Sequence, residues 1–243
     1  MKFFFLLKAL FTILLLTIYQ DIKAQDKSII VTYRKEAILN ESRFVNQPTK
    51  FSKIIEFRKK QNKALTDVGF YLFCNTSESL FKVDDILDLE TDRWKKMFIK
   101  LGGGGDLIYT NVKNKEQLWE KEAFGSDFLV ENDITTYNWE ITNETKKINK
   151  YICYKAISKR KVKDKEYTSV IAWFTPDLPY PFGPIEYCNL PGLILELEVA
   201  SIRFYAIKID LTPSNKEIIK PKKGKRVTFE ELIEIGKEMR SKK

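Results

Sequence analysis

The side chains that could carry acid–base chemistry in this chain are carboxylates, because the 243 residues include no histidine. That absence removes the commonest general base and metal ligand. Glu196 and Glu198 lie two residues apart in "LILELEV" (193–199). In a strand both would face one side, about 6–7 Å apart, which overlaps the separation in inverting glycosidases. We favour the ordinary alternative, a strand with its leucines inward and both glutamates facing solvent.

Metal and phosphate binding have little support. Zinc would need cysteines alone, and no C-x-x-C pair is present. Asp84, Asp85 and Asp88 lack the spacing of a calcium loop. The stretch "KLGGGGDLIY" (100–109) lacks the Lys-Ser/Thr that would follow in a phosphate loop, and it predicts a flexible turn leading into a strand at Leu107. We assign no catalytic, cofactor-binding or metal-ligating residue and expect no cofactor.

Three cysteines, Cys74, Cys153 and Cys188, allow one disulfide and one odd thiol in an oxidising compartment. Their spacing does not choose among the three pairings. We predict Cys153 with Cys188, because both lie in a region that reads as a single sheet. The bridge requires Cα atoms within about 7 Å of each other.

A proline-rich loop precedes the two glutamates. Five prolines, interleaved with aromatic residues, fall within 176–191. Each proline fixes φ and lowers the entropy lost on ordering the loop. We expect a rigid lid over one end of the sheet or a preformed docking surface. Pro191-Gly192 fits the centre of a type II turn, which would deliver the next strand in one register.

Short apolar and aromatic runs separated by charged turns predict strands. The predicted strands are 28–39, 69–75, 106–112, 127–132, 136–143, 151–158, 167–175, 193–199 and 202–211. Only Ala200-Ser201 separates the last two, which is a hairpin spacing. The fold class that follows is mainly β (α+β): a curved antiparallel sheet or a partly closed barrel, with a C-terminal helix and one internal helical segment.

Two segments have helical features. In "VDDILDLETDRWKKMFIKLG" (83–102) apolar residues recur at helical spacing and acids stand at the start. In "TFEELIEIGKEMRSKK" (228–243) Thr228 and Glu231 match a capping box, and apolar residues form one stripe. The basic segment 216–227 between this helix and the sheet predicts a linker.

The N-terminal residues read as an export signal. A positive start is followed by an apolar stretch, and Ala24 ends a passable cleavage site. The uninterrupted apolar run is far shorter than the roughly 20 residues that span a bilayer, so we expect cleavage near Ala24 and a periplasmic or secreted product. The expected division is signal peptide 1–24, β-rich domain 25–215, and linker with C-terminal helix 216–243.

The chain is basic, with a net charge of +9. Three lysines and one aspartate leave with the signal peptide, so the exported part carries +7. Outside the cytoplasm such a protein meets anionic lipid head groups, acidic glycans or a partner protein more readily than nucleic acid. We therefore expect no nucleic-acid partner, and at most weak peripheral contact with an anionic membrane.

Several segments resemble the GLPGLI family of exported envelope proteins. "NLPGLILELE" (189–198) is similar to the family's naming motif, with Asn189 in place of its first glycine; asparagine also tolerates a left-handed φ. "WEITNETKKINKYICYKA" (139–156) and "AWFTPDLPYPFGP" (172–184) are similar to further runs of the family, and "YLFCNTSESLF" (71–81) resembles an upstream segment. The motif residues are Asn189, Leu190, Pro191, Gly192, Leu193, Ile194, Trp173, Pro179, Gly183 and Pro184.

This resemblance implies export and a β-rich fold, but it implies no reaction and no catalytic residues. We therefore expect a non-enzymatic envelope protein. It would bind a partner protein or an apolar ligand through the concave face of its sheet and the 176–191 loop. The alternative is a hydrolase that uses carboxylates such as Glu196 and Glu198 on envelope glycans.

Overall fold

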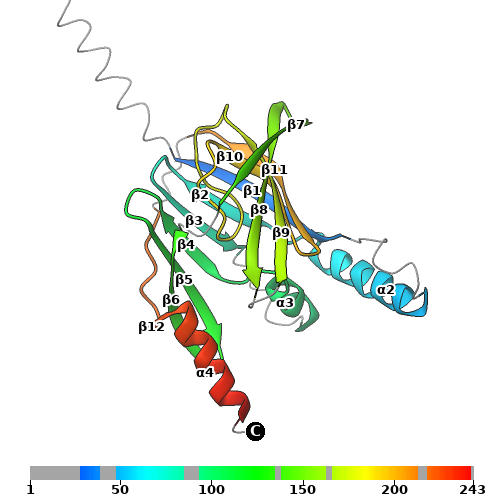
Figure 1. Ribbon diagram of the computed structural model, residues 1–243, viewed down its shortest axis with the longest axis vertical. Coiled ribbons are helices and arrows are strands. Elements are labelled where there is room, and N and C mark those ends of the chain that lie inside the picture. Colours follow the sequence, from blue (N-terminus) through cyan, green and yellow to red (C-terminus); the bar gives the residue numbers. More distant parts are fainter. Residues whose placement is uncertain are drawn as a thin grey trace, which may run out of the picture.

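The computed structural model describes residues 28–38, 48–84, 93–134, 138–162, 166–212 and 218–241, where the chain forms one sheet of twelve strands and three helices (Figure 1). The strands are β1 (Ile29–Ala37), β2 (Phe70–Cys74), β3 (Glu78–Val83), β4 (Leu107–Asn111), β5 (Glu116–Ala123), β6 (Ser126–Asn132), β7 (Glu140–Ile148), β8 (Tyr151–Val162), β9 (Glu166–Thr175), β10 (Leu193–Val199), β11 (Ile202–Asp210) and β12 (Lys225–Thr228). The helices are α2 (Pro48–Leu65), α3 (Arg93–Lys100) and α4 (Phe229–Ser241). The expected signal peptide, with its cleavage site at Ala24, lies outside the described residues.

The strands follow the order β12-β6-β5-β4-β3-β2-β1-β11-β10-β9-β8-β7 across one curved sheet (Figure 1). Neighbouring strands are antiparallel except β12 and β6, which are parallel. Since β7 and β12 are two separate edges, the sheet is open. The predicted fold class is confirmed, and of its two forms the open curved sheet is the one adopted.

Three strands and one helix go beyond the predicted elements: β3, β5, β12 and α2. The sequence of β5 (EQLWEKEA) is half charged, so its own propensity for extended structure is weak, and β3 (ESLFKV) has only a short apolar run. Pairing on both sides with neighbouring strands decides their conformation. Helix α2 is also rich in charge, and it packs through Phe57 edge-on against Phe98 of α3, with ring centres 5.4 Å apart.

The predicted linker 216–227 includes most of β12, which pairs with β6 and places Val227 in the main core. The sequence KRVT has a single apolar residue, so only the tertiary pairing marks it as a strand. Helix α4 follows directly. Its capping box forms as predicted: the Thr228 amide donates to Glu231 Oε2 at 2.7 Å, and the Glu231 amide donates to Thr228 Oγ1 at 3.2 Å.

Two apolar clusters lie on opposite faces of the sheet. Along β1 alternate residues are buried, from Ile29 to Ala37, and these face the main core; we call this side the core face. Ile30 instead packs on a smaller cluster formed by Phe73, Leu80, Tyr109, Leu118 and Leu129, and we call that side the second face. None of the described helices is both long and apolar enough to cross a membrane.

Candidate functional site

The proline-rich loop 176–191 connects β9 to β10 and packs onto the core face. Its buried apolar side chains are Leu178, Phe182, Ile185, Tyr187 and Leu190. The Leu193 amide donates to the Leu178 carbonyl at 3.0 Å. The Ile194 amide donates to the Phe182 carbonyl, also at 3.0 Å. The loop is therefore fastened to the first residues of β10.

Gly183, the first residue of the loop's Gly-Pro pair, lies against the Ile194 side chain. A Cβ on Gly183 would lie 2.7 Å from the Ile194 Cβ, so only glycine fits at this contact. From β1, the buried Tyr33 hydroxyl donates to the Ile194 carbonyl at 2.6 Å. Three segments thus meet at Ile194. Of the other motif residues, Leu190, Leu193 and Pro184 are buried, Trp173 is half-buried, and Pro179 and Pro191 are exposed.

Gly192 passes against the end of β9. A Cβ there would lie 2.1 Å from the Thr175 carbonyl oxygen. The Gly192 amide donates to the Leu190 carbonyl at 2.8 Å, so the chain turns over three residues centred on Pro191. The expected type II turn is not formed, because the φ of Gly192 is +153°, whereas that turn needs about +80° there. The Leu193 amide donates across the loop to Leu178 instead of back to Leu190.

Asn189 stands where the family motif has its first glycine. Its φ is +70°, in the left-handed region. Its side-chain amide donates to the Ile134 carbonyl at 2.9 Å. Asparagine thus supplies the backbone conformation that glycine would supply, and adds a hydrogen bond that glycine lacks.

The three cysteines are buried free thiols, so the expected Cys153–Cys188 disulfide is not formed. Cys153 lies on β8, whereas the backbone of Cys188 forms an isolated antiparallel β-bridge with that of Phe182 inside the proline-rich loop. The Cys188 carbonyl also accepts a hydrogen bond from Trp139 Nε1 at 2.9 Å. The two cysteines are therefore held by different elements, not by one continuous sheet. Burial raises the pKa of Cys153 to about 11 and that of Cys188 to about 12.

We expect all three thiols to resist alkylation by iodoacetamide at pH 8 while the protein is folded. The thiolate is the reactive form, and burial disfavours it at each cysteine. Mass spectrometry should count no adduct on the native protein in the time that a urea-unfolded sample takes up three. Fast labelling of the native protein, or an unfolded sample that accepts only one label, would contradict the free, buried thiols.

Glu196 is 8% exposed, and its carboxylate binds the Lys146 ammonium at 2.7 Å. The same ammonium lies 4.3 Å from the centre of the Trp173 ring. Strand alternation predicts solvent-facing glutamates; Glu196 departs from it because Lys146 reaches over β10 from β7. A bulge between Ile194 and Glu196 also shifts the register with β9. Neither Glu196 nor Glu198 lines either cavity described below.

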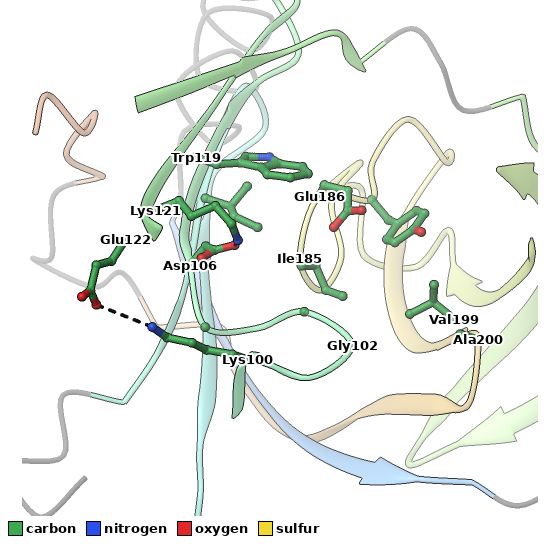
Figure 2. A pocket seen from close by; sticks show the side chains of 14 residues that line it. Lys100, Gly102, Asp106, Trp119, Lys121, Glu122, Ile185, Glu186, Val199 and Ala200 are labelled. Atoms are coloured by element: carbon green, nitrogen blue, oxygen red, sulfur yellow. Dashed lines mark hydrogen bonds and ion pairs between the residues drawn. The ribbon is translucent and has the colours of Figure 1, made fainter. Parts of the chain in front are cut away.

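A cavity of about 340 Å³ opens between the proline-rich loop, the glycine-rich turn after α3 and the β4–β5 hairpin. We call it the loop pocket. Figure 2 shows the side chains of Trp119, Lys121 and Asp106 on one side of it and those of Glu186 and Ile185 on the other. The backbone of the glycine-rich turn and the β10–β11 hairpin complete the lining. The pocket thus combines an aromatic wall with charged groups.

Gln117, a buried side chain on β5, fixes the position of the loop wall. Its Nε2 donates to the Glu186 carbonyl at 2.9 Å and to Thr110 Oγ1 at 3.0 Å. Its Oε1 accepts a hydrogen bond from Trp119 Nε1 at 3.1 Å. Satisfied buried networks of this kind specify one geometry. A single side chain therefore sets both the backbone of Glu186 and the orientation of the Trp119 ring.

Lys35 of β1 holds the end of α3 and the glycine-rich turn that follows it. Its Nζ donates towards four carbonyl oxygens, those of Phe98 (3.3 Å), Ile99 (2.8 Å), Leu101 (2.8 Å) and Gly103. Carbonyls at a helix C-terminus carry partial negative charge, which suits an ammonium. Lys35 is only 3% exposed, and burial lowers its pKa to about 7. The turn leads into β4 as predicted. The sequence predicts a flexible turn, whereas the hydrogen bonds from Lys35 hold its backbone in place.

Five charged side chains line the loop pocket. Lys121 binds Asp106 at 2.6 Å, and Lys100 lies 3.5 Å from Glu122. Glu186 is the fifth, so two lysines and three acids give the lining side chains a formal charge of −1. Glu186 is also the most deeply placed of the five, at 5% exposure. A positively charged or hydrogen-bond-donating guest complements this lining.

Ile185 has a φ of +58°, which is an outlier for a β-branched residue. Its side chain packs on the glycine-rich turn, where a Cβ on Gly103 would lie 3.1 Å from Ile185 Cδ1. Backbone strain of this kind costs about 1–3 kcal/mol and clusters at binding sites. The strained residue lies in the wall of the loop pocket, which marks this cavity as the candidate site.

The sequence singles out two parts of the pocket, the proline-rich loop and the glycine-rich turn. It misses Gln117, Trp119 and Lys121, because β5 does not read as a strand. In "EQLWEKEA" (116–123) the large apolar residues are only Leu118 and Trp119, too few to predict a strand. Within the described residues, no cluster of cysteine or acidic side chains could hold a metal ion.

A family model described as "Protein of unknown function (Porph_ging)" matches residues 160–196. The match covers less than half of the chain and reaches into β10, so it includes the whole proline-rich loop 176–191 and the motif residues at its end. It is compatible with the resemblance to the GLPGLI family, although that name is not confirmed by it. A search of curated proteins finds no match.

Among solved structures, two of PNGF-II are similar, in the C2 and P21 space groups, with TM-scores of 0.55 and 0.54 and 15% identity in both. Each alignment covers 86% of this chain and 32% or 33% of PNGF-II, so this chain spans about a third of that protein's length. The likeness shows the fold alone. A putative outer membrane lipoprotein-sorting protein domain from Vibrio parahaemolyticus matches at a TM-score of 0.28 and 12% identity, over 83% of this chain and 94% of that domain.

Proposed function

We propose that this chain is an exported, non-enzymatic binding protein of the cell envelope. Its loop pocket takes a small molecule with an apolar body and a protonated amine. The buried carboxylate of Glu186 at the wall of a formed cavity carries this proposal. The volume of about 340 Å³ falls within the range of about 300–1,000 Å³ of small-molecule sites.

Two further features support binding at this place. The apolar body of the guest would lie against Trp119, Ile108 and Ile185, which line the cavity. The walls are fastened before any guest arrives, by Gln117 on the loop side and by Lys35 behind the glycine-rich turn. A preformed site loses less free energy to ordering when it binds. Both fastenings therefore favour a binding pocket over an incidental gap.

The hydrolase alternative has no support from the carboxylates that motivate it. Glu196 is ion-paired with Lys146, and neither Glu196 nor Glu198 lines the loop pocket. A glycosidase needs its two carboxyl groups to flank a substrate cleft. The binding function is therefore the one that the described geometry supports best.

We expect 2-phenylethylamine to bind the protein and 3-phenylpropionate, with a similar body and opposite charge, to bind at least 10-fold more weakly. Glu186→Gln should weaken binding of the amine about 10-fold or more, because a hydrogen bond to a charged group contributes about 1.5–3 kcal/mol. Val199→Phe, which fills the pocket from its half-exposed rim, should abolish binding. Chemical-shift titration of the 15N-labelled protein measures each dissociation constant.

The matched control is Glu234→Gln on α4, the same chemical change at an exposed ion pair with Lys237, which should leave amine binding unchanged. Equal affinity for the amine and the acid, or amine binding that survives Glu186→Gln and Val199→Phe, would contradict the proposal. Export is tested on protein purified from its own host, whose intact mass should place the mature N-terminus near Gln25.

A further inference from the structure

A second and larger cavity lies on the second face of the sheet, with a volume of about 720 Å³. One wall comes from strands β2, β3, β4 and β5 and the other from the segment 219–223 that precedes β12. We call it the basic groove. None of the residues that line it also lines the loop pocket. The two cavities are therefore separate sites.

The apolar surface of the basic groove comes from Phe73, Leu80 and Leu107 on the sheet and from Ile219 and Pro221 on the facing segment. Phe73 and Leu80 are 6% and 9% exposed and belong to the cluster of the second face, so the floor is rigid. Ile219 is 66% exposed, the most exposed large apolar side chain among the described residues. An apolar guest between the two walls would cover Ile219.

The rim of the basic groove is positively charged. Four lysines line it, Lys82, Lys220, Lys222 and Lys223, together with one acid, Glu120. At its edge Lys220 binds Glu116 at 2.7 Å and Lys223 binds Asp127 at 2.9 Å. Together the four lysines and the three carboxylates of Glu120, Glu116 and Asp127 have a net formal charge of +1. The basic groove thus has the opposite charge preference to the loop pocket.

We propose that the basic groove binds the single acyl chain of a free fatty acid. The chain lies between the sheet wall and Ile219, and the carboxylate lies among the rim lysines. The volume fits one chain, and each buried methylene contributes about 0.8 kcal/mol. A groove with a buried floor suits one inserted chain, whereas contact with a bilayer surface would need its apolar side chains to project outward. The shape of the groove therefore favours a fatty acid over a membrane surface as its binding partner.

Palmitate, titrated below its aggregation concentration and followed by calorimetry, should bind with one site per protein. Octanoate should bind at least 100-fold more weakly, since eight methylenes are lost. Hexadecyltrimethylammonium should bind at least 10-fold more weakly than palmitate, because its head group meets the lysines. Ile219→Glu should weaken palmitate binding at least 10-fold without harm to folding, since this side chain is exposed.

Two control variants separate this site from other surfaces. Ile233→Glu on α4, a similar change at another exposed isoleucine, should leave palmitate binding unchanged, and so should the pocket-filling Val199→Phe. Palmitate binding that is insensitive to Ile219→Glu, or equal affinity for the cationic amphiphile, would overturn the proposal. Binding to phosphatidylglycerol vesicles without binding of palmitate would also overturn it, in favour of a membrane surface. None of these outcomes bears on amine binding in the loop pocket.

Discussion

Gly192→Ala is expected to lower the free energy of unfolding by more than about 3 kcal/mol, at the upper end of single-residue effects. The added Cβ would lie 2.1 Å from the Thr175 carbonyl oxygen and 3.0 Å from the Pro176 Cα, and both are backbone atoms that no rotamer change can move. The φ of +153° adds to the cost, because side chains other than glycine rarely adopt it. Urea denaturation followed by tryptophan fluorescence measures the loss.

The matched control is Gly125→Ala. Gly125 also has a positive φ, +77°, but nothing lies within 4 Å of its Cβ position. This variant should lose only the cost of a left-handed alanine, about 1–2 kcal/mol. Equal losses in the two variants would show that close backbone approach is not the reason for a glycine at 192. Recovery of Gly125→Ala as soluble protein, with Gly192→Ala found only in the insoluble fraction, would support the clash.

Lys35→Met is the second change with a large expected effect. Methionine occupies similar space but leaves the carbonyls of Phe98, Ile99, Leu101 and Gly103 without their shared donor. Removing one partner from a buried charged network costs about 3–5 kcal/mol. The variant also no longer buries an ammonium, which offsets part of this cost, so we expect a net loss of about 2–3 kcal/mol at pH 7. Urea denaturation at pH 7 measures this loss. Lys208→Met, the same change at an exposed position of β11, should be close to neutral.

The loss in Lys35→Met should grow as the pH rises from 7 to 10. The folded-state pKa of Lys35 is lowered from 10.5 to about 7, so over this range the unfolded chain binds more protons at Lys35 than the folded chain does. Excess protons on the unfolded state make the wild type more stable with rising pH, by up to about 1.4 kcal/mol per pH unit. The gain is complete above the unfolded value, and the methionine variant lacks it.

The comparison between the two proteins isolates Lys35. Tyrosines and cysteines also titrate in this range, but they do so in both proteins, and their contributions cancel in the difference. Urea denaturation at pH 7, 8, 9 and 10 gives that difference directly. A difference that stays flat would mean that the four carbonyl oxygens outweigh burial and keep the pKa of Lys35 at its ordinary value.

The sequence and the structure agree where the determining interaction is local. Alternation by twos predicts β1, β2, β4, β6, β8, β9, β10 and β11, each of which forms with small shifts at its ends. The Thr228–Glu231 capping box spans only three residues and forms as expected. The Ala200-Ser201 hairpin also forms, since Val199 pairs with Ile202. In each case neighbours in the chain supply the hydrogen bonds or the burial.

The candidate sites, in contrast, depend on contacts between residues that are far apart in the sequence. Lys35 is a charged residue in a strand, and only its position opposite the end of α3, 64 residues along the chain at Ile99, makes it a buried anchor. Gln117 orients the pocket through the Glu186 carbonyl, 69 residues away. The pairing of Glu196 with Lys146 spans 50 residues. No pattern within a short segment of sequence predicts these long-range contacts.

By itself, the sequence determined that the fold is mainly β with a C-terminal helix, that histidine chemistry is absent, and that a proline-rich loop enters β10 through a glycine. Periodicity, composition and turn chemistry are properties of short segments, so they can be read without a fold. The tertiary structure alone decided that β3, β5 and β12 join the sheet, that the cysteines are free thiols, and that two cavities of opposite charge preference open on its two faces. These features depend on side chains brought together from distant segments, and such contacts exist only once the whole sheet has formed.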